Sequence, residues 1–85
     1  MKLLTEQHLS KLVENGSVFR AFLTPYPAID GGGWFVDFDH TDDSATRHLY
    51  TSRCGLRLFD TSDDAIKTLH KCGFGGSVVL LDAKI

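Results

Sequence analysis

The histidines and cysteines are the side chains best suited to metal binding or nucleophilic chemistry, and they are spread along the whole chain. They are His8, His40, His48, His70, Cys54 and Cys72. A structural zinc ion needs four such ligands, usually contributed as closely spaced pairs. No C-x-x-C or H-x-x-x-H spacing occurs in this chain. We therefore predict no zinc site.

Acidic residues gather in the stretch 37–43, which contains Asp37, Asp39, Asp42 and Asp43 together with His40. Hard cations need several oxygen ligands, and this stretch offers atoms of the right kind. It lacks the central glycine and the terminal glutamate of a calcium loop. The sequence favours a solvated acidic hairpin tip over a metal site, and we predict that folding requires no metal.

Cys54, with one of the histidines, is the one obvious combination of a nucleophile and a base. Arg53 and Arg57 lie close to it in sequence, and nearby cations can lower the pKa of a thiol. No third residue can be assigned to orient the base. The glycine-rich stretches 31–33 and 73–76 precede a strand and follow a helix, whereas phosphate-binding glycines open a helix. We predict that the protein is not an enzyme and has no cofactor.

A set of aromatic and charged side chains is predicted to share one face of a sheet. Strict alternation in the stretch 34–39 places Trp34, Val36 and Phe38 on one face, which we expect to be buried. The opposite face would carry Phe35 and Asp37, joined from neighbouring strands by Arg20, Phe22, His48 and Tyr50. Such a face can stack nucleobases, can form the centre of a protein interface, or can be covered by a loop.

Arg53 and Arg57 form a local positive spot in a chain of negative net charge. Arg57 alternates with Leu56 and Leu58, so its guanidinium group faces away from the core if those leucines face the core. A guanidinium group can bind a carboxylate or a phosphate in bidentate fashion. The alternative is that both arginines only pair with nearby carboxylates, those of Asp60, Asp63 and Asp64. The candidate binding residues are therefore Arg53, Arg57, Phe35, Tyr50 and Arg20.

Two helices are predicted from capping residues and apolar spacing. The first spans 6–15, with Thr5 as N-cap, an apolar stripe at 3–4 spacing, and Gly16 suited to the left-handed position after the helix. The second begins after Thr61, carries Asp64 where a capping box has its acidic residue, and ends at Gly73. Its buried stripe is Ala65, Ile66, Leu69 and Cys72.

Strands are predicted at 17–24, 34–39, 47–52, 56–59 and 77–81. The first should stop before Pro25, because proline cannot donate to a β-ladder, and Arg53-Cys54-Gly55 should form a hairpin loop. The order is helix, four strands, helix, strand. It predicts one α+β domain over 1–85, with a mostly antiparallel sheet and both helices packed on one face. The second helix would return the last strand to the sheet in parallel.

Composition excludes several classes of protein. Nine Lys and Arg against eleven Asp and Glu give a net charge of −2, which does not favour nucleic acid as a partner. Apolar runs such as 78–81 are far shorter than the roughly 20 residues of a transmembrane helix. Two cysteines are few for a small secreted domain. We predict a cytoplasmic protein with unlinked thiols, a Cys54–Cys72 disulfide being the alternative.

Three segments together resemble a known family. They are Gly32-Gly33-Trp34-Phe35-Val36, the pattern Thr51-x-Arg53-x-Gly55-x-Arg57-x-Phe59, and Asp64-Ala65-Ile66 with Leu69 and a closing Gly73. In this order, over about residues 17–82, the chain resembles the small ParC-type partition-associated proteins encoded on plasmids and integrative elements. The resemblance implies a non-enzymatic accessory role in maintaining a mobile element, through protein contacts.

These observations lead to one expected function and one alternative. We expect a small adaptor that binds a protein partner, which can be a second copy of the chain, and that has no membrane partner. The alternative is a nucleic-acid-binding module that uses the open sheet face. An enzyme using Cys54 is the most distant hypothesis. The salt dependence of binding separates the first two, because phosphate contacts release counterions.

Overall fold

The computed structural model describes residues 2–26, 33–53 and 55–81. Its elements are β1 (Lys2–Leu4), α1 (Glu6–Glu14), β2 (Val18–Tyr26), β3 (Gly33–His40), β4 (Ala45–Leu49), α2 (Ser62–Lys71) and β5 (Ser77–Leu80). Five strands form one sheet with two helices, so the predicted α+β fold class is confirmed. Neither helix is long and apolar enough to cross a membrane. Cys54 and most of the glycine-rich stretch 31–33 lie outside the described residues.

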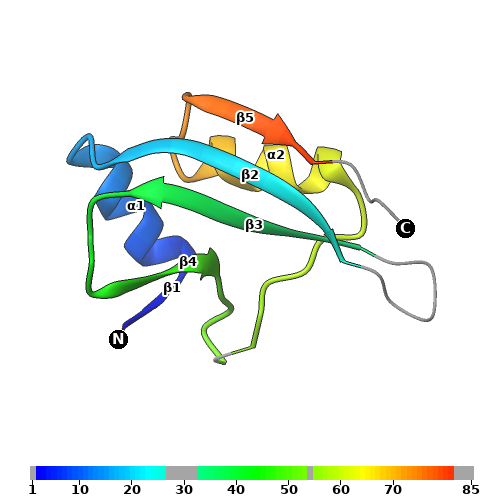
Figure 1. The fold of residues 1–85 in the computed structure, drawn as a ribbon, viewed down its shortest axis with the longest axis horizontal. Helices are drawn as coiled ribbons and strands as arrows, with labels where there is room; N and C mark the ends of the chain where they lie inside the picture. The colour runs from blue at the N-terminus through cyan, green and yellow to red at the C-terminus, as the bar shows by residue number, and fades with distance from the viewer. Residues whose placement is uncertain (1, 27–32, 54, 82–85) are drawn as a thin grey trace.

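The sheet has the strand order β1-β4-β3-β2-β5 (Figure 1). At its centre, β3 runs antiparallel to both β2 and β4. At its edges, β1 is parallel to β4 and β5 is parallel to β2. The predicted parallel return of the last strand is therefore confirmed. Helix α1 connects β1 to β2, and α2 leads into β5, so each edge strand is linked to the rest of the sheet through a helix.

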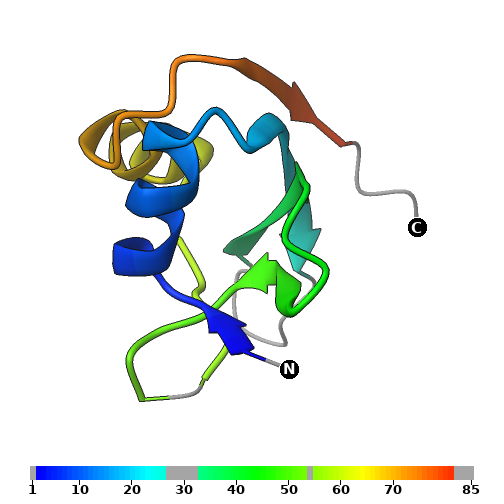
Figure 2. The same ribbon diagram turned by 90° about the vertical axis from the view of Figure 1, so that its left-hand side faces the viewer.

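Both helices lie on the same face of the sheet, as predicted, and leave the other face free of helices (Figure 2). The hydroxyl groups of Thr5 and Thr61 cap α1 and α2, each accepting a hydrogen bond from the backbone N–H three residues later. Gly16 and Gly73 follow the helices with φ of 69° and 88°. The predicted caps and stops of both helices are thus confirmed.

The core lies between the sheet and the two helices. It consists of Leu4, Leu9, Leu12, Ala21, Leu23, Val36, Phe38, Leu49, Phe59, Ala65, Leu69, Cys72 and Phe74. Phe38 is the largest fully buried side chain, and its ring packs edge-to-face on Phe74 with centroids 6.4 Å apart. Trp34 lies on the same face of β3 as Val36 and Phe38, as predicted, and is partly buried against the core.

Two segments pair differently from the prediction. The stretch 56–59 meets the sheet through two isolated bridges, Tyr50 with Leu56 and Trp34 with Phe59, instead of forming a continuous strand. The fifth strand of the sheet is instead β1, which the sequence did not predict. Its three residues are too few to show an alternating pattern in the sequence. On either side of Cys54, which lies outside the described residues, the Thr51 N–H donates to the Gly55 carbonyl at 2.7 Å.

Strand β2 continues through Pro25 to Tyr26, so the prediction that Pro25 ends it was wrong. The Leu81 N–H donates to the Leu23 carbonyl, which shows that Leu23 directs its polar groups toward β5. Pro25 is two residues further along, so its backbone nitrogen also faces the β5 side of β2. There it has no strand to bond, because β5 ends at Leu80. The missing N–H of Pro25 therefore costs no hydrogen bond to β3, where its partner is Trp34.

Candidate functional site

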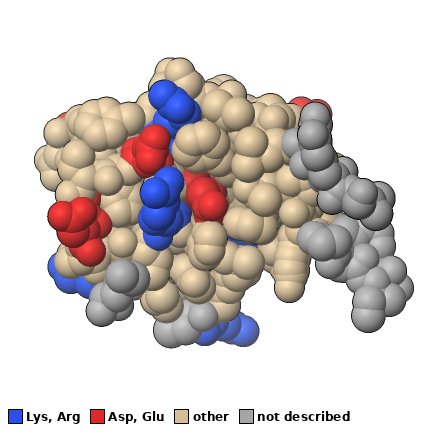
Figure 3. Space-filling view, in the orientation of Figure 1, with Lys and Arg blue, Asp and Glu red and all other residues tan. Residues whose placement is uncertain are grey.

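The sheet face opposite the helices carries the side chains that we call the open face. They are Arg20, Phe22, Thr24 and Tyr26 of β2, Phe35, Asp37 and Asp39 of β3, Arg47 and His48 of β4 with the following Tyr50, and Ser77 and Val79 of β5. In Figure 3, which views this side of the molecule, a small group of alternating basic and acidic side chains lies among uncharged ones, and further charged side chains lie toward the rim. The open face unites three predicted binding residues, Arg20, Phe35 and Tyr50.

Cross-strand pairing arranges the charged residues of the open face in rows. In one row, Arg20 of β2 is opposite Asp39 of β3, and the Asp39 carboxylate accepts a hydrogen bond from Arg47 Nη2 at 3.2 Å. In the next row, Asp37 of β3 is opposite His48 of β4, and their side chains are hydrogen-bonded. Asp39 therefore lies between two arginines, and Asp37 lies between Phe22 and His48. The two arginines and two aspartates cancel in formal charge.

A bulge in β4 is what brings Arg47 and His48 to the same face. Lys2 is paired with Ala45 but Leu4 with Leu49, so the register of β1 and β4 shifts between these pairs. The Leu4 N–H donates instead to the Thr46 hydroxyl at 3.0 Å. Bulges place consecutive side chains on one side of a strand and re-aim them. No local pattern in the sequence indicates this bulge, and Arg47 was accordingly not among the predicted binding residues.

An aromatic row crosses the open face beside the charged rows. The rings of Tyr26 and Phe35 lie 6.2 Å apart with an interplanar angle of 82°, and those of Phe35 and His48 lie 5.3 Å apart at 85°. The ring of Tyr50 continues the row at 6.4 Å from His48. Edge-to-face contacts of this kind add about 0.5–1.5 kcal/mol beyond the burial of area. The row is therefore a partly exposed aromatic ridge that crosses β2, β3 and β4.

Arg57 is engaged within the fold. Its Nε lies 3.6 Å from Glu6 Oε2 on α1, and its guanidinium carbon lies 4.6 Å from the centre of the Phe59 ring. Arg57 and Glu6 line a cavity of about 400 Å³ beside the N-terminus of α1, together with Tyr50. The predicted alternative partners, Asp60, Asp63 and Asp64, make none of these contacts. Arg53 is exposed in the turn.

The condition for Arg57 to face outward, that Leu56 and Leu58 both face the core, is not met. Leu58 is 46% exposed, and Phe59 is the buried residue of this segment. The reason is that isolated bridges hold 56–59, so strict strand alternation does not apply. The structure therefore does not bring Arg57 and Arg53 onto the open face with the other three predicted residues.

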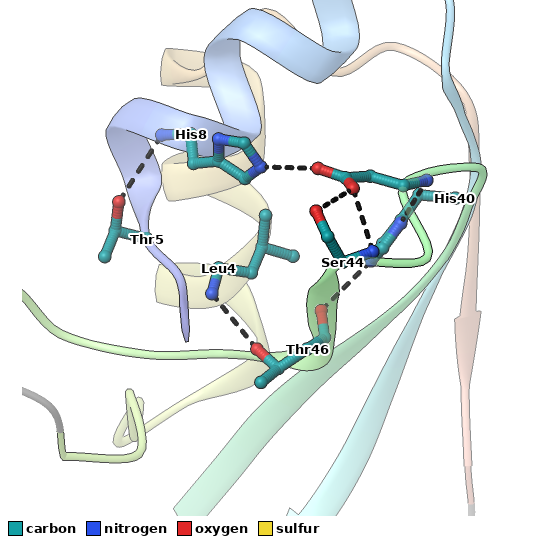
Figure 4. A network of polar contacts seen from close by, with 7 residues as sticks. Leu4, Thr5, His8, His40, Ser44 and Thr46 are labelled. Carbon is teal, nitrogen blue, oxygen red and sulfur yellow. Dashed lines mark hydrogen bonds and ion pairs between the residues drawn. The ribbon is translucent and has the colours of Figure 1, made fainter. Parts of the chain in front are cut away.

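The acidic hairpin tip is held by a polar network (Figure 4). Asp42 accepts hydrogen bonds from the hydroxyl and the N–H of Ser44, at 2.6 and 3.0 Å, and is hydrogen-bonded to His8 Nε2 of α1 at 2.9 Å. The Asp42 N–H donates to His40 Nδ1, so His40 Nε2 carries the proton that it donates to the Thr46 carbonyl. Bonds from Ser44 first and His8 second lower the pKa of Asp42 from 3.8 to about 2. The network joins α1 to the β3–β4 turn.

The described residues offer little for metal or thiol chemistry. Within 2–26, 33–53 and 55–81, no three His, Cys, Asp or Glu side chains are grouped to hold a metal ion. Cys72 is buried, and its burial raises the pKa of the thiol. An activated nucleophile has a lowered pKa, so Cys72 lacks the character of one.

No family model, no curated protein and no solved structure matches this chain. The site is therefore interpreted from its geometry and charges alone.

Proposed function

We propose that this protein is a small adaptor that binds a protein partner through its open face and does no catalysis. The observation that carries the proposal is the balance of charge on that face. Each aspartate of β3 lies beside a basic residue of β4, at Asp39–Arg47 and Asp37–His48, and the aromatic ridge lies next to them. Protein interfaces are rich in aromatic residues and arginine, whereas binding to a phosphate backbone needs an excess of positive charge.

Phe35 is the best point at which to test this surface, because its ring lies between Tyr26 and His48 at the middle of the ridge. Leu58 is the matched control: it is an exposed apolar residue outside the open face. A photo-crosslinking amino acid is placed at either position in the native host. We expect a defined protein adduct from position 35 and none of the same mass from position 58.

Affinity for the identified partner then measures the contribution of the ridge. Truncation of an aromatic residue central to an interface costs about 2 kcal/mol or more, so Phe35→Ala should raise the Kd by about thirtyfold while Leu58→Ala leaves it nearly unchanged. Adducts of nucleic acid at position 35, with binding that weakens steeply with salt, would support the nucleic-acid module instead. Identical adducts from both positions would contradict any role for the open face.

The resemblance to ParC-type proteins suggests a setting for this adaptor, the maintenance of a plasmid or integrative element. Replication and partition genes beside this gene would support that setting.

A further inference from the structure

The outer edge of β5 carries backbone N–H and C=O groups for which the described residues provide no partner strand. Because the Leu81 N–H donates to Leu23 of β2, alternation directs the N–H and C=O groups of Val78 and Leu80 away from β2. Among the described residues, no strand pairs with this side of β5. Two residues with outward polar groups, in extended conformation, can template a further strand.

This edge, although short, lacks three of the usual protections against strand pairing: charged residues, proline and a bulge. From Cys72 to Leu81 the chain has no charged residue and no proline, and β5 pairs with β2 in unbroken register. Natural edge strands are normally blunted by lysine, proline or a bulge. Leu80 and Leu81 are 52% and 40% exposed, and Phe19, next to Arg20 in the paired strand β2, is 60% exposed. The edge is therefore both open and flanked by exposed apolar side chains.

The opposite edge of the sheet is closed. The Lys2 N–H donates to the Ser44 carbonyl, and Leu4 uses its N–H and C=O for Thr46 and Tyr50. Only Leu3, between them, directs its backbone groups outward. A single residue cannot support a ladder, so among the described residues β5 provides the one edge of the sheet that can pair.

We propose that two copies of this chain associate through antiparallel pairing of β5 with β5 about a two-fold axis. With the axis at Val79, Val78 of one copy lies opposite Leu80 of the other, and each such pair exchanges two backbone hydrogen bonds. An uncharged strand suits a second copy of itself, because the symmetric contact opposes no like charges. A two-fold contact uses the same surface on both copies. Because pairing occupies the open edge of both copies, the assembly stops at a dimer.

The antiparallel arrangement keeps the two open faces on the same side of a continuous sheet, because a two-fold axis perpendicular to the sheet preserves its faces. Dimerisation does not depend on the partner proposed above, since Val78 and Leu80 contribute backbone groups at the edge and Phe35 lies on β3, separated from β5 by β2.

Mass measurement by light scattering over a range of concentrations tests the proposal. We expect the mass to rise from 9.4 kDa toward twice that value. Leu80→Lys places like charges across the axis and should raise the dimer dissociation constant by about tenfold or more, because like charges in an interface are strongly unfavourable. Leu58→Lys, the same change at an exposed leucine outside the edge, should leave that constant nearly unchanged.

Hydrogen exchange tests whether the dimer contact is β5 pairing, because that pairing protects the outward amides of alternate residues. In the dimer the Val78 and Leu80 amides should be protected, and on dilution they should exchange rapidly while the Leu81 amide stays bonded to Leu23. A chain that remains a monomer at all concentrations overturns the proposal. A dimer that Leu80→Lys leaves intact, or one in which the Val78 and Leu80 amides exchange freely, overturns it equally.

Discussion

Asp42 illustrates how one side chain stabilises a loop that the sequence alone shows only as polar. Its pKa in the folded chain is about 2, below the ordinary 3.8, because Ser44 and His8 donate to the carboxylate. A carboxyl group with a lowered pKa contributes stability that is complete above its unfolded pKa. That contribution is lost as the pH falls from about 4 to about 2.

The thermal midpoint of unfolding, measured from pH 7 to pH 2, tests this linkage. Asp42→Asn keeps an oxygen for Ser44 but removes the charge. We expect wild type to have the higher midpoint at neutral pH, with the difference shrinking below pH 4 in the window set by Asp42. Asp43→Asn, at an exposed neighbour, is the control. A difference between wild type and Asp42→Asn that is constant down to pH 2 would contradict the assigned pKa.

Single residues of the site differ in how well sequence could place them. Alternation was enough to put Phe35 with Arg20, because β2 and β3 are regular strands around them. Arg47 needed the β4 bulge, which depends on the distant β1. The ion pair of Arg57 with Glu6 joins segments far apart in sequence, and no local pattern encodes such a contact.

Among the elements, the glycines around the end of α2 allow a matched test. Gly73 has φ of 88°, whereas Gly75 has no positive φ and no atom from a non-adjacent residue within 4 Å of the place that a Cβ would take. Gly73→Ala should destabilise the protein by about 1–2 kcal/mol, because a side chain is strained in the left-handed region.

Gly75→Ala should be neutral or stabilise the protein by up to about 1 kcal/mol, because it restricts the unfolded chain. Urea unfolding curves for the two variants give the comparison. Equal stability of both variants would show that the conformation of Gly73 is not required for the end of α2.

Elements with local signals were the ones that sequence predicted. Both helices carry their caps and stops in adjacent residues, and both formed as expected. The β1 strand and the two bridges of 56–59 depend on partners elsewhere in the chain, and their residues alone have no distinguishing period. Pro25 shows the same limit, because its effect depends on which neighbour its nitrogen faces.

At the scale of the whole molecule, some strand pairs of the sheet join segments close in sequence and others join segments far apart. The β2–β3 and β3–β4 pairs join consecutive strands, while β1 pairs with β4 across the intervening helix and two strands. Contacts between distant segments carry the larger loop-closure cost and tend to form late. Leu4 of β1 and Leu23 of β2 are both fully buried. The same substitution at these two leucines therefore compares the β1–β4 pair with the pairs of consecutive strands.

Leu4→Ala and Leu23→Ala should each destabilise the protein by about 2–5 kcal/mol, but through different rates. We expect Leu4→Ala to act mainly by faster unfolding and Leu23→Ala to slow folding more, as stopped-flow chevron plots would show. If Leu4→Ala slows folding at least as much as Leu23→Ala does, pairing of β1 is an early event and the expected order of pairing is wrong.

The position of β1 also has a consequence for the chain as a ribosome makes it. β1 is synthesised before every other strand, yet its one partner, β4, begins at Ala45. Until Leu49 has left the exit tunnel, Leu4 has no β-strand to pair with, although α1 beside it can already be helical. The first strand of this sheet to be translated therefore waits until β4 has been made before it can join the sheet.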